Sequence, residues 1–331
     1  MVLRGGPVRG SSGAGVAAVL AAAVLWGTTG TAAEFAPDVG PLAMGAAALG
    51  IGGVLQALIA LGPLRRERTA LAARMPLLLL GAAGVVIYPL AFYSAMHLAG
   101  VAVGTVVSLG AAPIASGLLE RLLHGRRLSA PWLVSTALGI AGAAVLCLAK
   151  LDDAPDDLLS TTAGVGLGLL AGTAYALYSW VARRLMADGI GRAAVMGAVF
   201  GLGGAGLLPI LLVTGAPLLA SPQAFGIGAY MALLPMFLGY LLFGVGLTRV
   251  PASSATTLTL VEPAVAALLA VVVVGERLPV MGWAGLAGIG ASLVLLALAP
   301  ATRSPRTDPA RPGRRPPRGS GRRQWEDASW P

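Results

Sequence analysis

The sequence is divided into ten long apolar stretches that carry almost no charged side chains. A helix needs roughly 20 apolar residues to cross a bilayer, and each stretch supplies about that many. Only 11% of the residues are charged, whereas ordinary soluble domains carry about 25%. The pattern predicts an all-α integral membrane protein with ten transmembrane helices. The expected spans are 14–33, 41–61, 76–96, 101–122, 131–149, 162–182, 194–214, 224–247, 252–274 and 279–299.

The placement of the basic residues predicts how the chain is oriented in the membrane. Cytoplasmic loops are enriched in Lys and Arg. With the N-terminus in the cytoplasm, 21 of the 23 basic residues fall on that side, and only Lys150 and Arg277 fall outside. The acidic run 152–157 then lies in an external loop, 150–161. Both termini are therefore expected in the cytoplasm, and the Ala, Gly, Arg and Pro bias indicates the plasma membrane of a GC-rich bacterium.

The terminal segments 1–13 and 300–331 lie outside the predicted spans. The C-terminal one is rich in Pro, Arg and Gly, and such a composition cannot form a core. We predict a disordered cytoplasmic tail whose charge fixes the topology. The alternative is contact with anionic lipid headgroups, worth about 1 kcal/mol per arginine near the surface. Nucleic-acid binding is not predicted, because no fold or stacking platform accompanies the charge.

The two halves of the chain resemble each other at an offset of 150 residues. Ala112-Pro113 corresponds to Glu262-Pro263, and Gly125-Arg126-Arg127-Leu128 corresponds to Gly275-Glu276-Arg277-Leu278. The predicted repeats, 14–149 and 162–299, each hold five spans, so the second is inverted relative to the first. Inverted repeats suit alternating access, in which one half rocks against the other. Chance similarity between Ala-, Gly- and Leu-rich helices is the alternative.

Several motifs resemble the EamA family of the drug/metabolite transporter superfamily. They are Leu25-Trp26-Gly27, the segment Leu260-Val-Glu-Pro-Ala-Val-Ala-Ala-Leu-Leu-Ala, Gly275-Glu276-Arg277-Leu278, and Gly285-Leu-Ala-Gly-Ile-Gly. The sequence departs at Gly125-Arg126-Arg127, where the family usually has an acidic residue after the glycine. The resemblance implies ten helices in a 5+5 inverted repeat. It also implies export or exchange of amino acids, other metabolites or drugs, without selecting one substrate.

Glu262 is the only acidic residue deep in a predicted span. A charge at mid-membrane costs roughly 2.5–3.5 kcal/mol on insertion scales, so the side chain should face protein or a cavity. Pro263 donates no N–H, which leaves the carbonyl of Thr259 without its helical partner. This carbonyl, the Thr259 hydroxyl and the Glu262 carboxylate are predicted to form a polar spot for proton exchange or amine binding. The alternative is a structural glutamate beside a helix kink.

Prolines and aromatic residues within spans are further candidates for shaping a substrate cavity. A proline inside a helix frees one carbonyl and permits a bend, although static packing is the alternative. Aromatic residues near span ends often form interface belts rather than ligand sites. The candidate kink residues are Pro89, Pro113, Pro209, Pro235 and Pro263. The candidate substrate-binding aromatic residues are Trp26, Tyr88, Tyr93, Tyr175 and Tyr240.

Two other classes of function compete with a secondary transporter of small molecules. A membrane-embedded enzyme would need converging catalytic groups at membrane depth, and no H-E-x-x-H, G-x-S-x-G or P-loop motif is present. A non-transporting scaffold or sensor would leave the inverted repeat unexplained. The single cysteine, Cys147, excludes a disulfide framework or a cysteine-based zinc site within one chain. We therefore expect neither catalytic residues nor a cofactor or metal.

Glycines 139, 142, 285 and 288 in spans 131–149 and 279–299 could let helices meet between protomers, so we hypothesise a homodimer, with internal packing as the alternative. Glu120, Arg121 and His124 follow helical spacing at a cytoplasmic span end and are interpreted as a surface cluster.

Overall fold

The computed structural model describes residues 9–125, 128–149, 158–274 and 277–298, and within these ranges the chain is helical with no strand. The first half contains α1 (Arg9–Gly27), α2 (Thr29–Glu34), α3 (Pro41–Ile59), α4 (Leu61–Arg66), α5 (Arg68–Ala72), α6 (Met75–Ala99), α7 (Val101–His124) and α8 (Ala130–Leu148). The second half contains α9 (Leu158–Ala187), α10 (Arg192–Thr214), η2 (Ala216–Leu219), α11 (Pro222–Met231), η3 (Ala232–Leu238), α12 (Gly239–Leu247), α13 (Ala252–Leu258), η4 (Thr259–Val261), α14 (Glu262–Leu269), η5 (Ala270–Val274) and α15 (Val280–Leu298).

Ten helical segments among the described residues are long and apolar enough to cross a membrane, which confirms the ten predicted spans. Their limits are Gly13–Glu34, Pro41–Ile59, Met75–Ala99, Val101–Leu123, Ala130–Leu148, Leu158–Ala187, Arg192–Thr214, Pro222–Leu247, Ala252–Val273 and Val280–Leu298. Prolines begin several of them, because a missing N–H costs little in the first helical turn. The predicted disordered tail, most of the acidic loop and most of the N-terminal segment lie outside the described residues.

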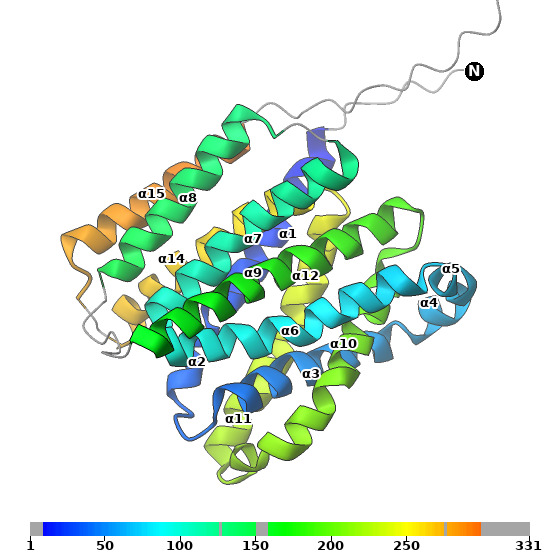
Figure 1. The fold of residues 1–331 in the computed structure, drawn as a ribbon, viewed down its shortest axis with the longest axis horizontal. Coiled ribbons are helices and arrows are strands. Elements are labelled where there is room, and N and C mark those ends of the chain that lie inside the picture. The colour runs from blue at the N-terminus through cyan, green and yellow to red at the C-terminus, as the bar shows by residue number, and fades with distance from the viewer. Residues whose placement is uncertain (1–8, 126–127, 150–157, 275–276, 299–331) are drawn as a thin grey trace, which may run out of the picture. The chain divides into compact units, whose positions relative to one another are not determined.

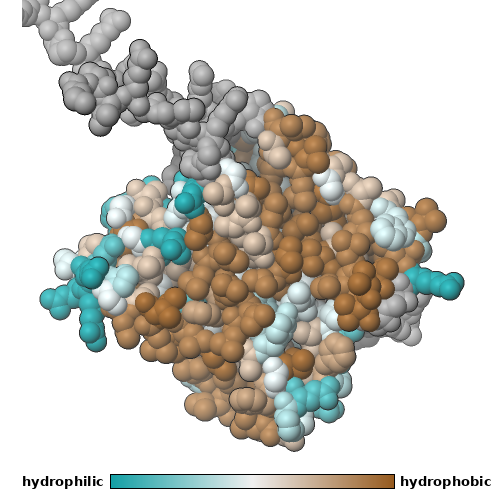
Figure 2. Space-filling model, turned by 180° about the vertical axis from the view of Figure 1, so that it is seen from behind, coloured by the Kyte–Doolittle hydropathy of each residue, from teal (hydrophilic) through white to brown (hydrophobic). Residues whose placement is uncertain are grey.

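The surface of the bundle carries many exposed large apolar side chains. Leu212 and Val213 are each 85% exposed, and Leu298 is 75% exposed. Hydrophobic side chains cover most of the face seen in Figure 2, and hydrophilic ones gather toward its edges. A monomeric soluble protein rarely exposes so large an apolar patch. Lipid chains are the solvent that such a surface fits.

The helices pack in pairs that join distant parts of the sequence. α6 lies along α9, α10 lies along α3, and α15 lies along α8 (Figure 1). α1 packs against α12 and α14, which places the first span between the eighth and ninth spans. A cluster of buried aromatic side chains fills the centre, with Tyr175, Tyr178, Tyr240, Phe200 and Phe243 among the largest fully buried groups.

The contact between α8 and α15 relates the last span of each half. Ser135 meets Ser292 and Gly142 meets Gly285, so residue numbers fall on one helix as they rise on the other. A Cβ atom on Gly142 would lie 2.7 Å from the backbone nitrogen of Ile289, hence only glycine lets these helices approach so closely. The four glycines that suggested a homodimer therefore face partners within the chain. The homodimer remains a prediction without that support.

Candidate functional site

The ninth span is interrupted at Glu262. The α-helical pattern of α13 ends at Leu258, a 3₁₀ turn covers Thr259–Val261, and Glu262 opens α14. Pro263 lacks the N–H that would bond the Thr259 carbonyl, so a tighter turn replaces regular α-helix there. The 3₁₀ turn runs directly into α14, and Glu262 is the first residue of that helix.

The eighth span is interrupted in a similar way at Pro235. Residues Ala232–Leu238 form a π-helical segment, η3, between α11 and α12. Proline breaks the regular hydrogen-bond ladder, and a wider turn accommodates the break. The indole N–H of Trp26 donates to the Pro235 carbonyl at 2.9 Å, which joins the first span to the eighth. Pro89, Pro113 and Pro209 lie inside helices that continue through them.

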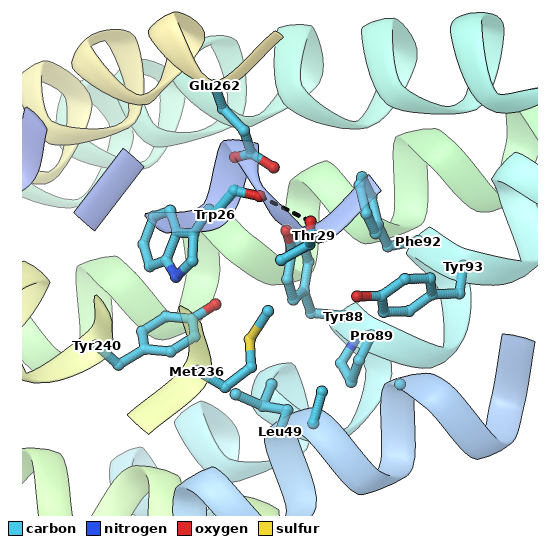
Figure 3. Close-up of a pocket in the computed structure, with 12 residues that line it drawn as sticks. Trp26, Thr29, Leu49, Tyr88, Pro89, Phe92, Tyr93, Met236, Tyr240 and Glu262 are labelled. Atoms are coloured by element: carbon cyan, nitrogen blue, oxygen red, sulfur yellow. Dashed lines mark hydrogen bonds between the residues drawn. The ribbon is translucent and has the colours of Figure 1, made fainter. Parts of the chain in front are cut away.

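The two interruptions border one cavity, drawn in Figure 3 and called here the Glu262 cavity. Its lining residues are Trp26, Thr29, Gly45, Ala48, Leu49, Tyr88, Pro89, Phe92, Tyr93, Met236, Tyr240 and Glu262. They come from the first, second, third, eighth and ninth spans. The open volume is about 10 Å³, about what one water molecule needs. A metabolite would fit only after the walls separate.

Glu262 reaches this cavity with an uncompensated carboxyl group. The residue is only 7% exposed, and no hydrogen bond or ion pair reaches its carboxylate from the described residues. Figure 3 shows the carboxylate directed toward the aromatic side chains that line the cavity. The hydroxyl groups of Tyr88 and Tyr93 likewise have no hydrogen-bond partner in the described part of the chain. Three polar groups thus remain available to an occupant.

Aromatic rings make up much of the remaining wall. The ring centroids of Trp26 and Tyr240 lie 4.8 Å apart, and those of Tyr88 and Phe92 lie 5.6 Å apart. The Tyr240 hydroxyl shares a 2.7 Å hydrogen bond with the Tyr178 hydroxyl, which fixes the orientation of the Tyr240 ring. Aromatic faces carry negative potential and attract cations. The wall therefore suits a group that is both apolar and positively charged.

The structure brings together five of the seven predicted substrate-binding residues. Trp26, Tyr88, Tyr93, Tyr240 and Glu262 all line the cavity, whereas Tyr175 and Thr259 do not. The Tyr175 hydroxyl donates to the Thr259 hydroxyl at 3.2 Å, and Thr259 donates in turn to the Thr256 carbonyl at 2.9 Å. Thr259 is therefore engaged behind the wall rather than in a polar spot with Glu262. The roles of all seven in transport remain predictions.

Sequence reasoning missed Thr29, Phe92 and Met236 as lining residues. Each lies three or four positions from a predicted aromatic residue, on the same helical face, and this spacing was the signal that could have found them. The interpretation of Glu120 as part of a surface cluster is wrong. Glu120 is 8% exposed, and its carboxylate accepts hydrogen bonds from the backbone N–H and the hydroxyl of Ser253.

The Glu120 contact has a local cause. α13 begins after Pro251, whose side chain cannot accept a hydrogen bond from the free N–H groups of the first helical turn. Glu120 of α7 supplies that acceptor at 3.2 Å from the Ser253 nitrogen. The fourth and ninth spans are thereby joined at one end.

Comparisons with known proteins agree with this architecture. The model of the EamA-like transporter family matches residues 13–148 and 162–298, once for each half. An uncharacterized transporter, YwfM, of Bacillus subtilis is 36% identical over 283 residues, which cover 85% of this chain and 93% of that protein. A probable terminal-alkyne amino-acid exporter of Streptantibioticus cattleyicolor is 29% identical over 244 residues, covering 70% of this chain and 77% of that protein.

A solved crystal structure shares the fold, with a TM-score of 0.71 at 20% sequence identity. The match covers 88% of this chain and 97% of that one. The two family matches confirm the two repeats expected from the offset of 150 residues, and together they span most of the sequence. This chain, a multi-pass membrane protein of ten spans in a 5+5 inverted repeat, belongs to the EamA-like transporter family.

Proposed function

We propose that the chain is a secondary transporter that exports small amine-bearing metabolites, amino acids among them, by alternating access. The observation that carries the proposal is the Glu262 carboxylate, which faces an aromatic cavity without a protein partner among the described residues. A charge in the membrane interior is costly unless an opposite charge or a proton offsets it. A protonated amine or a coupling proton supplies that positive charge.

The wall chemistry supports an amino acid or amine as the occupant. An ammonium group is attracted both to a carboxylate and to the faces of Trp and Tyr rings. Trp26 and Tyr240 lie on one side of the cavity and Tyr88 and Tyr93 on the other (Figure 3). The two unpartnered tyrosine hydroxyls can donate hydrogen bonds to a substrate carboxylate. One carboxylate and two hydroxyl donors thus complement the two charged groups of an amino acid.

The small size of the cavity supports an alternating-access mechanism. An open volume of about 10 Å³ holds no metabolite, so the conformation described here is closed around the site. Substrate would enter when one repeat moves relative to the other. No nucleotide-binding motif occurs in the sequence, and the driving force is therefore a gradient of protons or of another solute. Glu262 is the group that we assign to coupling.

We further propose that the chain exports its substrate across a bacterial plasma membrane. The similar protein of Streptantibioticus cattleyicolor is named an amino-acid exporter, which supports export as the direction. We place the chain in a bacterial plasma membrane with both termini in the cytoplasm, because 21 of the 23 basic residues then face that side. We also keep the hypothesis that the chain forms a homodimer, which concerns its assembly and not its transport function.

Flux measurements in proteoliposomes test the proposal. Labelled amino acids, other amines, and matched neutral and anionic compounds are offered to liposomes with the purified full chain and to empty liposomes, with and without a pH gradient. We expect saturable flux of amine-bearing compounds that responds to the gradient. Flux of neutral or anionic compounds alone, or no flux above that of empty liposomes for any amine, would contradict the proposal.

A further inference from the structure

Gln56 is a buried polar residue that does not line the Glu262 cavity. It lies near the end of α3 and is 1% exposed, and neither its amide nitrogen nor its amide oxygen has a hydrogen-bond partner among the described residues. Leaving a buried amide unpaired costs free energy, and native structures rarely retain such groups without a reason. In the span 41–61, Gln56 is also the only side chain with an amide or a charge. This arrangement points to a ligand that completes its hydrogen bonds.

Gln56 lines a second cavity, called here the Gln56 cavity, between α3, α10 and α12. Its lining residues are Gln56, Ile59, Ala60, Arg192, Ala193, Met196, Gly197 and Leu241. The open volume is about 100 Å³, several times the roughly 10–15 Å³ that one water molecule needs. None of these residues lines the Glu262 cavity. The two cavities are therefore separate sites.

The charge in the Gln56 cavity is positive. Arg192 is half-buried and forms no ion pair with any described residue, and the other lining side chains besides Gln56 are apolar. Arg192 is also the first residue of α10, where free backbone N–H groups and the helix dipole favour an anion. The nearby Glu67 carboxylate accepts hydrogen bonds from the Gly191 N–H at 3.0 and 3.1 Å and does not line the cavity.

We propose that Gln56 and Arg192 form a binding site for a phosphate-type oxyanion. The guanidinium supplies charge and paired donors, and the amide N–H₂ of Gln56 supplies a further donor. Two sources offer this chemistry, the phosphodiester of a lipid headgroup and a free phosphate. The site borders the outer surface of the bundle, since Ile59 is 59% exposed. The proposal does not depend on the transport function.

Thermal unfolding of the purified full chain in detergent micelles, at constant ionic strength, tests the site in two arms. One arm titrates inorganic phosphate. The other titrates phosphatidylglycerol against a phosphate-free glycolipid with the same acyl chains. Each arm compares the wild type with Gln56→Leu, Arg192→Gln and the matched control Arg65→Gln, which makes the same charge change outside the cavity.

We expect the wild type and Arg65→Gln to be stabilised with the same apparent dissociation constant. Gln56→Leu and Arg192→Gln should bind at least about tenfold more weakly, as expected for the loss of a hydrogen bond to a charged group. Stabilisation by phosphatidylglycerol alone identifies a lipid headgroup, and stabilisation by inorganic phosphate as well identifies a site for free oxyanions. No stabilisation of the wild type by either probe, or equal stabilisation of all four proteins, would overturn the proposal.

Discussion

The hydroxyl of Ser135 donates to the carbonyl of Ser292 at 2.8 Å, and the hydroxyl of Ser292 donates to the carbonyl of Ser135 at 2.7 Å. The exchange is reciprocal, as an approximate twofold relation between antiparallel α8 and α15 requires. Both residues are buried, so each hydroxyl would lose this buried partner if the helices separated. The last spans of the two repeats are therefore joined by polar contacts as well as by close glycine packing.

Removing either hydroxyl should weaken this contact by a modest amount. We expect Ser135→Ala or Ser292→Ala to lower the free energy of unfolding by about 0.6 kcal/mol, with an upper limit near 1.7 kcal/mol, the range for hydrogen bonds between membrane helices. Unfolding in mixed micelles measures the change. Thr173→Ala is the matched control, because the hydroxyl of the exposed Thr173 donates to the Leu169 carbonyl of its own helix. A loss for Thr173→Ala as large as that for the serine variants would contradict the assignment.

The glycine contact between α8 and α15 predicts a larger effect. A Cβ atom on Gly142 would lie 2.8 Å from the Gly285 carbonyl oxygen, and backbone atoms cannot move aside as a flexible side chain can. Gly142→Ala should therefore lower the free energy of unfolding by about 1–3 kcal/mol. A Cβ atom on Gly290 would meet no atom of the described residues within 4 Å, so Gly290→Ala should be neutral or slightly stabilising. Because the contact lies within one chain, the loss should not vary with protein concentration.

The hydrogen bonds between Glu120 and Ser253 predict a third effect on stability. Ser253→Ala removes the hydroxyl that donates to the Glu120 carboxylate at 2.9 Å. A hydrogen bond to a charged group contributes about 1.5–3 kcal/mol, and we expect a loss in that range in denaturant unfolding. The neighbouring Ser254 has no such bond in the structure, so Ser254→Ala is the control. Equal stability of the two variants would show that the contact stabilises nothing.

The spans were predictable because the bilayer imposes a length and a composition on each helix. The contacts between helices were not, since an apolar helix in lipid offers no hydrophobic stripe to mark its packed face. The burial of Glu120 depends on α13 beginning beside it, and nothing local to 101–122 signals that. Gly142 and Gly285 were recognised as packing residues, but the sequence alone could not choose between a partner chain and α15.

The site was predictable where a residue conflicts with its surroundings. Glu262 is an acid inside an apolar span, and its position in a cavity wall follows from that local chemistry. Pro263 beside it and Pro235 in the eighth span interrupt their helices, as expected for a residue without an N–H. Thr259 lies one turn before Glu262, yet its hydroxyl bonds Tyr175 and Thr256 instead. Which way each side chain points depends on neighbours from other spans. Gln56 was overlooked, although an amide in an apolar span is a signal of the same kind.

The orientation of the chain is open to direct measurement. In a Cys147→Ser background, single cysteines replace Arg68, Arg306 or Asp153, and intact cells are treated with a membrane-impermeant maleimide. We expect labelling at position 153 only, because the arginine-rich loops should face the cytoplasm. Labelling at position 68 or 306 together with protection at position 153 would contradict the predicted topology and indicate the opposite orientation. Permeabilised cells provide the control for reactivity at every position.

The role of Glu262 is the centre of the account, and Glu262→Gln isolates it. Glutamine keeps nearly the same shape and still hydrogen-bonds, but it carries no charge and exchanges no proton. The matched control is Glu34→Gln, the same chemical change on an exposed residue at the end of α2. Both variants must first show the thermal stability of the wild type, so that a change in flux reports on the cavity.

The decisive measurement is the flux of an amine-bearing substrate against pH in proteoliposomes of the wild type and both variants. We predict that Glu262→Gln lowers the flux at least about tenfold, as expected for the loss of an interaction with a charged group, or abolishes its dependence on pH. Glu34→Gln should behave as the wild type does. Unchanged flux with unchanged pH dependence in the stable Glu262→Gln variant would contradict the account and leave Glu262 as a residue of the helix break.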